Sequence, residues 1–249
     1  MEKKSSKIAT GILGFDDLAK DGIERGSVIL IAGGTGTGKT NFCSQFLHYG
    51  AQQGENGLYI TFEEDPDQIQ RHVAAIGIDF SKFVKAGKTK FQKVDVYKVS
   101  KAVEAEILRA KGELLIDMKS LPEIIPRGFK PNRIVVDSLS ALSAVFKPED
   151  YRYFVFKFFS FLKSLGATVF AISETTQDPS EFSRTGIEEF LGDGVFVLYS
   201  IKQGDVRIRA VEILKLRGSS HEGRIVPFKI TEKGIQVFPT QSILAAGEV

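Results

Sequence analysis

Residues 33–40 read Gly33-Gly34-Thr35-Gly36-Thr37-Gly38-Lys39-Thr40, a full match to the phosphate-binding pattern G-x-x-x-x-G-K-[ST]. Glycines allow the backbone N–H groups of such a loop to converge on an anion without side-chain clash. In this role Lys39 neutralises the β- and γ-phosphates of a nucleotide, and the Thr40 hydroxyl ligates Mg²⁺. The stretch therefore predicts a ligand, ATP or its product ADP with Mg²⁺, as well as a local fold.

The flanking residues have the required order of strand, loop and helix. The run 28–32 (Val-Ile-Leu-Ile-Ala) is apolar and β-branched, which is typical of a buried parallel strand. After the loop, Phe42, Phe46 and Tyr49 recur at near-helical spacing. The alternative, a glycine-rich hairpin turn, needs a second strand where this helical pattern stands.

Composition limits the class of protein. The 249 residues are 43% hydrophobic and 26% charged, as in an ordinary soluble globular protein, and the net charge of +2 gives no general polyanion-binding signal. Cys43 is the single cysteine, so an internal disulfide or a cysteine metal cluster is excluded. No apolar run approaches the roughly 20 residues of a membrane span, and the first residues lack a signal-peptide pattern. We expect one domain over 1–249, a cytoplasmic setting and no membrane insertion.

Strands and helices are expected to alternate over the first part of the chain and to give way to strands alone. The earlier strands are predicted at 58–62, 91–97, 133–137 and 168–173, and the later ones at 195–200, 206–216, 225–230 and 235–238. Helices are predicted at 66–77, within 80–90, over 101–127 with a break near Gly112 or Pro122, and at 148–165. This order predicts an α/β fold with a mostly parallel central sheet, flanking helices and C-terminal antiparallel strands.

Asp137 closes an apolar strand downstream of the loop. An acid at this place is the expected Walker B partner, which holds Mg²⁺ through water. The alternative is an aspartate that only caps the turn after its strand.

Glu63 and Glu64 follow the strand predicted at 58–62. Ligands of open parallel sheets bind beyond the carboxyl ends of the strands, so a carboxylate here can orient the water that attacks the γ-phosphate. Position alone leaves a second interpretation open, in which both are solvated acids ahead of a helix N-terminus.

Lys215 and Arg217 are separated by one residue, which places two cations on one face of a strand. Taken alone, this pattern favours an exposed edge strand protected by charge.

The helix at 148–165 is rich in aromatic residues, too short and too charged to span a bilayer. They are Tyr151, Tyr153, Phe154, Phe156, Phe158, Phe159 and Phe161. Aromatic side chains nearly all around a helix exceed what one buried face needs, so we expect core packing together with a subunit interface.

Nearly the whole chain resembles a single-domain member of the KaiC-like family of RecA-superfamily ATPases. The resemblance is carried by the segments 10–18, 33–40, 61–64, 137–142, 186–190 and 213–221. Within them, Thr-Phe-Glu-Glu at 61–64 and Lys-Leu-Arg-Gly-Ser-Ser-His at 215–221 are far more specific than the loop.

The resemblance implies a RecA-like P-loop fold and a homohexameric ring with ATP between subunits. It implies that Glu63 is the catalytic glutamate with Glu64 beside it, and that Lys215 and Arg217 reach the γ-phosphate of the adjacent subunit. It implies further nucleotide contacts, with Leu216, Ser219, His221 and Thr231 near the same nucleotide, and with Asn41 and Ala75 on the subunit that owns the loop. Because the full motif is present, the resemblance favours a contact of Lys215 and Arg217 with the γ-phosphate over the protection of an exposed edge strand by charge.

The chain departs from the family in two respects. It carries one such domain where the clock protein has two, and it lacks a clear match to the phosphorylated Ser-Thr pair, so a clock or autokinase role is not supported. Where RecA has a glutamine sensor at the end of a strand, this chain has Ser173-Glu174.

Three functions compete at this stage. The first is a hexameric ATP-hydrolysing enzyme, with a regulatory role, favoured by Glu63 and Arg217. The second is a nucleotide-gated switch or scaffold for an unidentified protein partner, with little turnover, as in archaellum regulators of the same superfamily. The third, a relative of the DNA recombinases, is disfavoured because the segment 174–190 holds Glu174, Asp178, Glu181, Glu188 and Glu189 against Arg184 alone.

Overall fold

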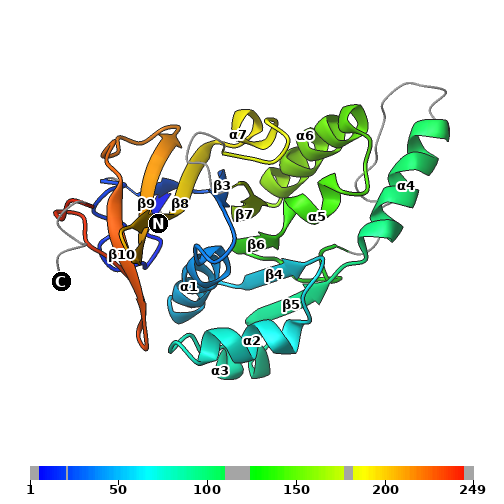
Figure 1. The fold of residues 1–249 in the computed structure, drawn as a ribbon. Helices are drawn as coiled ribbons and strands as arrows, with labels where there is room; N and C mark the ends of the chain where they lie inside the picture. Colours follow the sequence, from blue (N-terminus) through cyan, green and yellow to red (C-terminus); the bar gives the residue numbers. More distant parts are fainter. Residues whose placement is uncertain (1–5, 21, 110–123, 177–181, 244–249) are drawn as a thin grey trace.

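A sheet of nine strands forms the centre of the computed structural model, which describes residues 6–20, 22–109, 124–176 and 182–243. The strand order is β11-β10-β9-β8-β3-β7-β6-β4-β5 (Figure 1). The parallel part comprises β8 (Gly194–Gln203), β3 (Val28–Gly33), β7 (Thr168–Glu174), β6 (Arg133–Asp137), β4 (Gly57–Thr61) and β5 (Thr89–Lys93). The antiparallel part comprises β9 (Val206–Leu216), β10 (Val226–Thr231) and β11 (Gly234–Val237). Strands β1 (Lys7–Ile8) and β2 (Ile23–Glu24) form a separate antiparallel ribbon.

Helices cover both faces of the parallel part. Packed on one face are α1 (Lys39–Gln52), α2 (Pro66–Ala74) and α3 (Ser81–Lys85), and on the other α4 (Val96–Arg109), α5 (Leu139–Ser143) and α6 (Pro148–Ser164) (Figure 1). Alternate residues of each strand serve the two layers: Ile29 and Ile31 pack toward α1, whereas Val28 and Leu30 pack toward α6. Burial on both faces explains why these strands read as continuous apolar runs.

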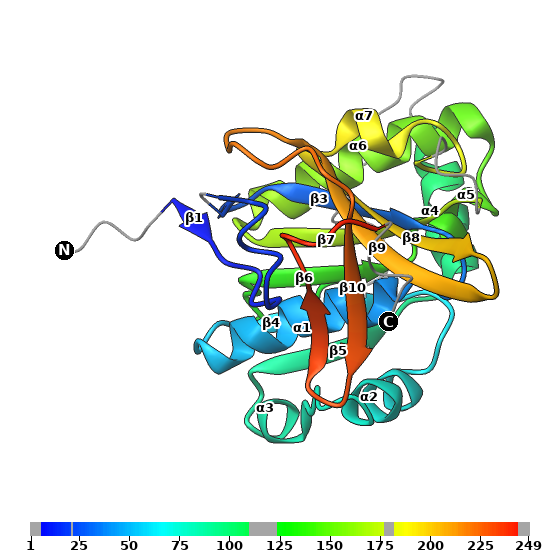
Figure 2. The same cartoon turned by 60° about the vertical axis from the view of Figure 1, so that its left-hand side comes forward.

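The antiparallel strands extend the sheet and fold over α1 (Figure 2). Gln45 joins α1 to β11, because its Oε1 accepts a hydrogen bond from the backbone N–H of Ile235 at 2.6 Å. Its Nε2 donates to the carbonyl of Gly11, in the segment before β2, at 3.3 Å. The predicted fold class, a mostly parallel sheet with flanking helices and C-terminal antiparallel strands, is confirmed. None of the described helices has the length and apolar character that a membrane span requires.

One predicted element is wrong. The strand expected at 91–97 is β5 at Thr89–Lys93, and Tyr97 belongs to α4. The side chain of Asp95 accepts hydrogen bonds from the N–H groups of Tyr97 and Lys98, so it caps a helix where the sequence alternation favours a strand. The break expected near Gly112 or Pro122 lies outside the described residues.

Most aromatic side chains of α6 are used inside the molecule. Tyr151, Phe154, Phe158 and Phe159 are buried against the sheet, and Phe156 is 52% exposed. Core packing therefore accounts for more of this helix than expected, and a subunit interface on it stays a prediction.

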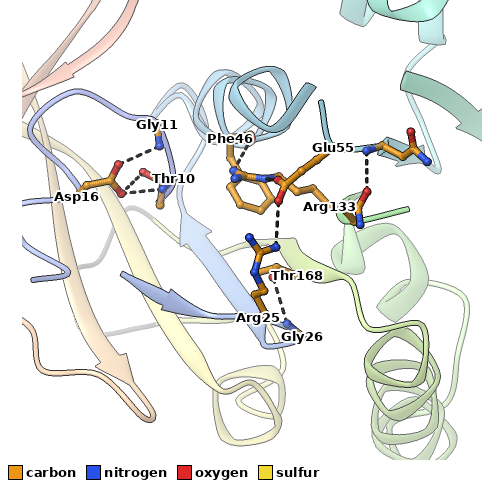
Figure 3. Close-up of polar contacts among 11 residues, drawn as sticks. Thr10, Gly11, Asp16, Arg25, Gly26, Phe46, Glu55, Arg133 and Thr168 are labelled. Atoms are coloured by element: carbon orange, nitrogen blue, oxygen red, sulfur yellow. Dashed lines mark hydrogen bonds and ion pairs between the residues drawn. The ribbon is translucent and has the colours of Figure 1, made fainter. Parts of the chain in front are cut away.

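A buried arginine fastens α1 to the amino end of β6 (Figure 3). Arg133 is 2% exposed and donates from Nε to Glu55 Oε2 at 2.6 Å and from Nη1 to the carbonyl of Phe46 at 3.0 Å. Arg25 donates to the other Glu55 oxygen at 3.0 Å. Residue 50 of α1 is a glycine, and a Cβ at this position would lie 2.4 Å from Arg133 Cδ, so a larger residue would displace the arginine. The cluster secures the edge of the sheet opposite the phosphate-binding loop.

This cluster predicts a pH-dependent loss of stability. Burial alone raises the pKa of the Glu55 carboxyl, but the hydrogen bonds and charges of Arg133 and Arg25 outweigh it, so this pKa lies below its ordinary value of 4.5. A pKa that is lower in the folded state gives stability that is present above about pH 4.5 and is lost as the pH falls through the folded-state value. In urea unfolding, Glu55→Gln should cost roughly 1–3 kcal/mol near neutral pH and flatten the acid dependence.

Glu104→Gln, an exposed change on α4, is the matched control and should leave both quantities unchanged. An acid dependence as steep in Glu55→Gln as in the wild type would contradict this role for Glu55.

Candidate active site

The phosphate-binding loop connects β3 to the N-terminus of α1. Gly36 and Gly38 have φ angles of 76° and 96°, which only glycine adopts without strain. The Lys39 ammonium group donates to the carbonyls of Gly33 and Gly34 at 2.8 and 2.9 Å, and Thr37 Oγ1 donates to Gly34 at 2.9 Å. These bonds hold Lys39 across the loop, at the end of the helix that attracts anions.

Strand register brings the other candidate residues to this same edge. Gly33 of β3 pairs with Glu174 of β7, and Asp137 of β6 pairs with Thr61 of β4, two residues before Glu63. The carboxyl ends of neighbouring parallel strands thus line one cleft. Its volume is about 390 Å³, and it is lined by Thr35, Gly36, Gly38, Lys39, Thr40, Asn41, Asp137, Ile172, Glu174, Arg209 and Ile230.

Asp137 is held by two hydroxyl groups. Tyr59 Oη donates to Asp137 Oδ2 at 2.5 Å, and Thr40 Oγ1 lies 3.3 Å from the same oxygen. Burial raises the pKa of the Asp137 carboxyl, against the opposing effect of these hydrogen bonds and of Lys39. Because both hydroxyl groups use Oδ2, neither occupies Oδ1.

The two glutamates after β4 differ in environment. Glu63 is exposed, whereas Glu64 is half-buried and its Oε1 lies 3.1 Å from His72 Nδ1. The charge of Glu64 is close enough to add to the raised pKa of Asp137. The structure thus places Glu64 near Asp137, while a contact of Glu63 with the nucleotide stays a prediction.

Glu174 stands at the position of the expected sensor. Its backbone N–H donates to Ser140 Oγ at 2.8 Å, which links the end of β7 to α5 directly after Asp137. Burial lowers the pKa of the Lys39 ammonium, and Glu174 is the strongest of the nearby charges that oppose this shift. Glu174 therefore lines the cleft close enough to Lys39 for their charges to interact.

Arg209 of β9 is a cleft residue that the sequence analysis missed. Its Nε donates to the carbonyl of Gly36 at the tip of the loop, at 3.2 Å. Tyr59 of β4, which donates to Asp137, was not predicted either. The alternation of Arg207 and Arg209 on one strand face is the signal in the sequence, but it gains meaning only from the distant register that places β9 beside the loop.

Thr231 and Ala75 lie toward the loop. Ile230, the neighbour of Thr231, packs on Gly38, since a Cβ on Gly38 would lie 3.0 Å from Ile230 Cδ1. The turn after Thr231 meets Gly77, two residues past Ala75, because a Cβ on Gly77 would lie 2.4 Å from the Glu232 carbonyl. Within the chain Thr231 thus lies on the side of the phosphate-binding loop, away from the motif at 215–221, and the nucleotide that it contacts stays a prediction.

The motif at 215–221 lies at the opposite, amino edge of the parallel strands. Lys215 pairs with Val195 of β8, close to the start of β3, and β9 ends at Leu216, so Arg217 follows the strand instead of lying within it. Ser219 Oγ donates to the carbonyl of Gly22, at the same edge. His221 Nδ1 is buried and has no hydrogen-bond partner among the described residues.

Lys215 and Arg217 lie at the end of β9, where edge protection and a functional role are the two interpretations. β10 pairs with β9 only at residues 209–211, so the end of β9 is indeed an edge within the described sheet. However, Lys215 is half-buried and its ammonium group donates to the carbonyls of Glu189 and Gly192 at 3.0 and 2.7 Å. A charge that only protects an edge would point into solvent, whereas these bonds tie Lys215 to the chain just before β8; its role at a nucleotide stays a prediction.

The acidic segment 174–190 is partly used for internal contacts. Glu188, in α7 (Glu188–Leu191), is fully buried and accepts hydrogen bonds from Tyr151 and Thr185. Asp178 and Glu181 lie outside the described residues. The repulsion of DNA expected from this segment is therefore weaker than a simple count of its acids indicates.

Comparison with known proteins gives one consistent result. The sequence profile described as "ATPase: KaiC" matches residues 8–242. The chain is 36% identical to the circadian clock protein KaiC3 of Synechocystis over 95% of its own length, but it covers 46% of that protein. It is 33% identical to a UPF0273 protein of Thermotoga maritima, covering 94% of this chain and 97% of that one.

Among solved structures, a KaiC-like protein of Pyrococcus horikoshii superposes with a TM-score of 0.76 at 31% identity, covering 94% of this chain and 99% of that one. The chain spans about half the length of the KaiC relatives that it matches, such as 44% of the protein from Synechococcus elongatus. The family match spans nearly all of this chain, and the Thermotoga and Pyrococcus proteins are aligned over nearly their whole lengths. The chain therefore belongs to the KaiC family of P-loop ATPases.

Proposed function

We propose that this protein hydrolyses ATP at sites shared between adjacent subunits of a homohexameric ring. The observation that carries the proposal is the separation of the candidate residues onto two opposite edges of one sheet. The loop, Asp137 and Glu63 lie at the carboxyl edge, whereas Lys215, Arg217 and His221 lie at the amino edge.

The distance between the edges prevents a single chain from completing its own site. The Arg217 N–H donates to the Asp193 carbonyl, and the Asp193 N–H donates to Val28, so Arg217 stands level with the start of β3. The loop begins five residues later, at Gly33, which is about 16 Å along the strand. That span exceeds the length of an arginine side chain, which supports a role for Arg217 at the nucleotide of another subunit.

A contact between two different surfaces of adjacent subunits is the type of interface that builds rings. Each subunit offers its amino edge to the carboxyl edge of the next, and repetition of one such interface gives cyclic symmetry when the rotation closes.

Each residue then has a defined task. The backbone N–H groups of 34–40 and the Lys39 ammonium group hold the phosphates of ATP, and Arg209 steadies the loop through Gly36. Glu63 orients the attacking water, with Glu64 beside it. Lys215 and Arg217 of the adjacent subunit stabilise the charge that develops on the γ-phosphate.

Thr40 and Asp137 fit a magnesium site. A hydroxyl and a carboxylate that lie 3.3 Å apart and line one cleft are hard oxygen donors, which Mg²⁺ prefers. We infer that Thr40 binds the ion directly and that Asp137 holds it through water. The ion would neutralise phosphate charge, while Tyr59 fixes the orientation of the Asp137 carboxylate.

This arrangement predicts a selective effect of Tyr59→Phe. Loss of the hydroxyl should raise the Mg²⁺ concentration for half-maximal ATP binding by roughly tenfold, because hydrogen-bond partners of ligating carboxylates tune metal affinity. Nucleotide binding without Mg²⁺ should not change, since the phenyl ring still stacks on Phe91 at 5.2 Å. Tyr97→Phe, at a 67% exposed position, is the control. An unchanged Mg²⁺ dependence, measured by fluorescent-nucleotide titration, would contradict the proposed role of Tyr59.

The shared site is tested by mixing inactive subunits. Glu63→Gln spoils the loop side and Arg217→Ala the opposite side, so rings of either variant alone should hydrolyse ATP poorly. In mixed rings, about a quarter of the interfaces at equal random mixing join an intact loop side to an intact Arg217, and activity should return in that proportion.

The control mixes either single variant with the double variant Glu63→Gln/Arg217→Ala, in which no interface is intact. Verified mixed rings without recovered activity would contradict the shared site.

Turnover distinguishes the enzyme from a nucleotide-gated switch. Glu63 is exposed in the single chain, so water at the γ-phosphate is ordered only once a neighbour covers it. A regulatory ring would show nucleotide-dependent assembly with slow hydrolysis, and rapid hydrolysis without any partner protein would exclude a pure switch.

A further inference from the structure

Asp193, just before β8, is fixed from several directions. Its Oδ2 accepts the N–H of Val28 at 2.9 Å, its own N–H donates to the Val28 carbonyl at 2.7 Å, and its carbonyl accepts the N–H of Arg217 at 2.9 Å. The carboxylate therefore cannot turn without breaking contacts to β3. Among the described residues, the cations that contact this carboxylate do so at Oδ1.

Two cations compete for that oxygen. The Lys163 ammonium group of α6 lies 2.8 Å from Asp193 Oδ1, whereas Arg217 Nη1 lies 3.8 Å from it. The Arg217 side chain is 60% exposed, against 38% for Lys163 and 18% for Asp193. Lys163 thus holds the close contact, while Arg217 makes only the longer ion pair and keeps most of its side chain exposed.

The competition matters because a charge-assisted hydrogen bond between a guanidinium group and a carboxylate is strong, and Asp193 Oδ1 offers Arg217 such a partner. Such a pair would draw the guanidinium back to its own subunit and would have to break before it met a phosphate. Lys215 cannot prevent this, because its ammonium group is already bound to the carbonyls of Glu189 and Gly192.

We propose that Lys163 is a positioning residue, which occupies Asp193 and so keeps Arg217 available for the nucleotide of the neighbouring subunit. This inference rests on the proposed function, in which Arg217 acts across the interface. Asp193 fixes the backbone of Arg217, while Lys163 neutralises the carboxylate that would otherwise capture its side chain.

The test is a double-mutant cycle in the full-length protein, followed by ATPase kinetics. Lys163→Met should lower kcat by about tenfold or more with little change in KM, because Arg217 acts in the transition state. Adding Asp193→Asn to the same chain should restore kcat to within about threefold of wild type, since the amide still accepts the Val28 N–H but no longer attracts Arg217. Lys163→Arg should retain activity.

The matched control is Lys157→Met on the same helix, where the lysine lies over the Tyr153 ring at 5.4 Å and forms no ion pair with a carboxylate of the described residues. It should leave kcat unchanged. A merely structural role of Lys163 predicts the opposite pattern, in which the second substitution fails to restore activity and the melting temperature falls further.

Two results would overturn the inference: wild-type kcat in Lys163→Met, or a double variant as slow as Lys163→Met. Arg217→Ala, measured in parallel, separates this from a failure of the proposed function. If Arg217→Ala is slow and Lys163→Met is not, only the positioning role falls; if Arg217→Ala keeps wild-type kcat, both fall.

Discussion

The polarity of β3 governs the layout of this molecule. Its carboxyl end leads into the phosphate-binding loop, and at its amino end Val28 is joined to Asp193 by two hydrogen bonds. Because β9 runs antiparallel to β8, its last residues return to the amino end, and they carry Lys215 with them. One rigid, fully buried strand thereby sets the spacing between the two groups of candidate residues, and side-chain motion cannot close it.

Around that strand, each edge is held by its own polar contacts. At the carboxyl edge, the bond from Glu174 to Ser140 joins β7 to α5, and Tyr59 joins β4 to Asp137, so the strands that line the cleft are linked across the sheet. At the amino edge, Arg133 and Glu55 fasten α1 to β6. Contacts of this kind preorganise a site, since they fix side chains before a ligand arrives.

Local patterns in the sequence predicted the loop, the strand that ends in Asp137 and the order of strands and helices, because each depends on neighbouring residues. They did not predict Arg209, whose partner Gly36 is 173 residues away, nor Tyr59, whose role depends on the pairing of β4 with β6. The displaced strand at 89–93 shows the same limit, because the capping bonds of Asp95 outweighed an alternating pattern. Thr231 and the motif at 215–221 lie at different edges of the sheet, which composition and residue spacing could not predict because it follows from the order and direction of the strands.

A structure of the assembled protein with Mg²⁺ and a non-hydrolysable ATP analogue would show whether one site is built from two subunits. We expect a nucleotide on the loop of one subunit, with Arg217 and Lys215 of the next within hydrogen-bond distance of its γ-phosphate. A nucleotide enclosed by residues of its own chain alone, with Arg217 of every subunit still beside Asp193 and away from any phosphate, would contradict this expectation.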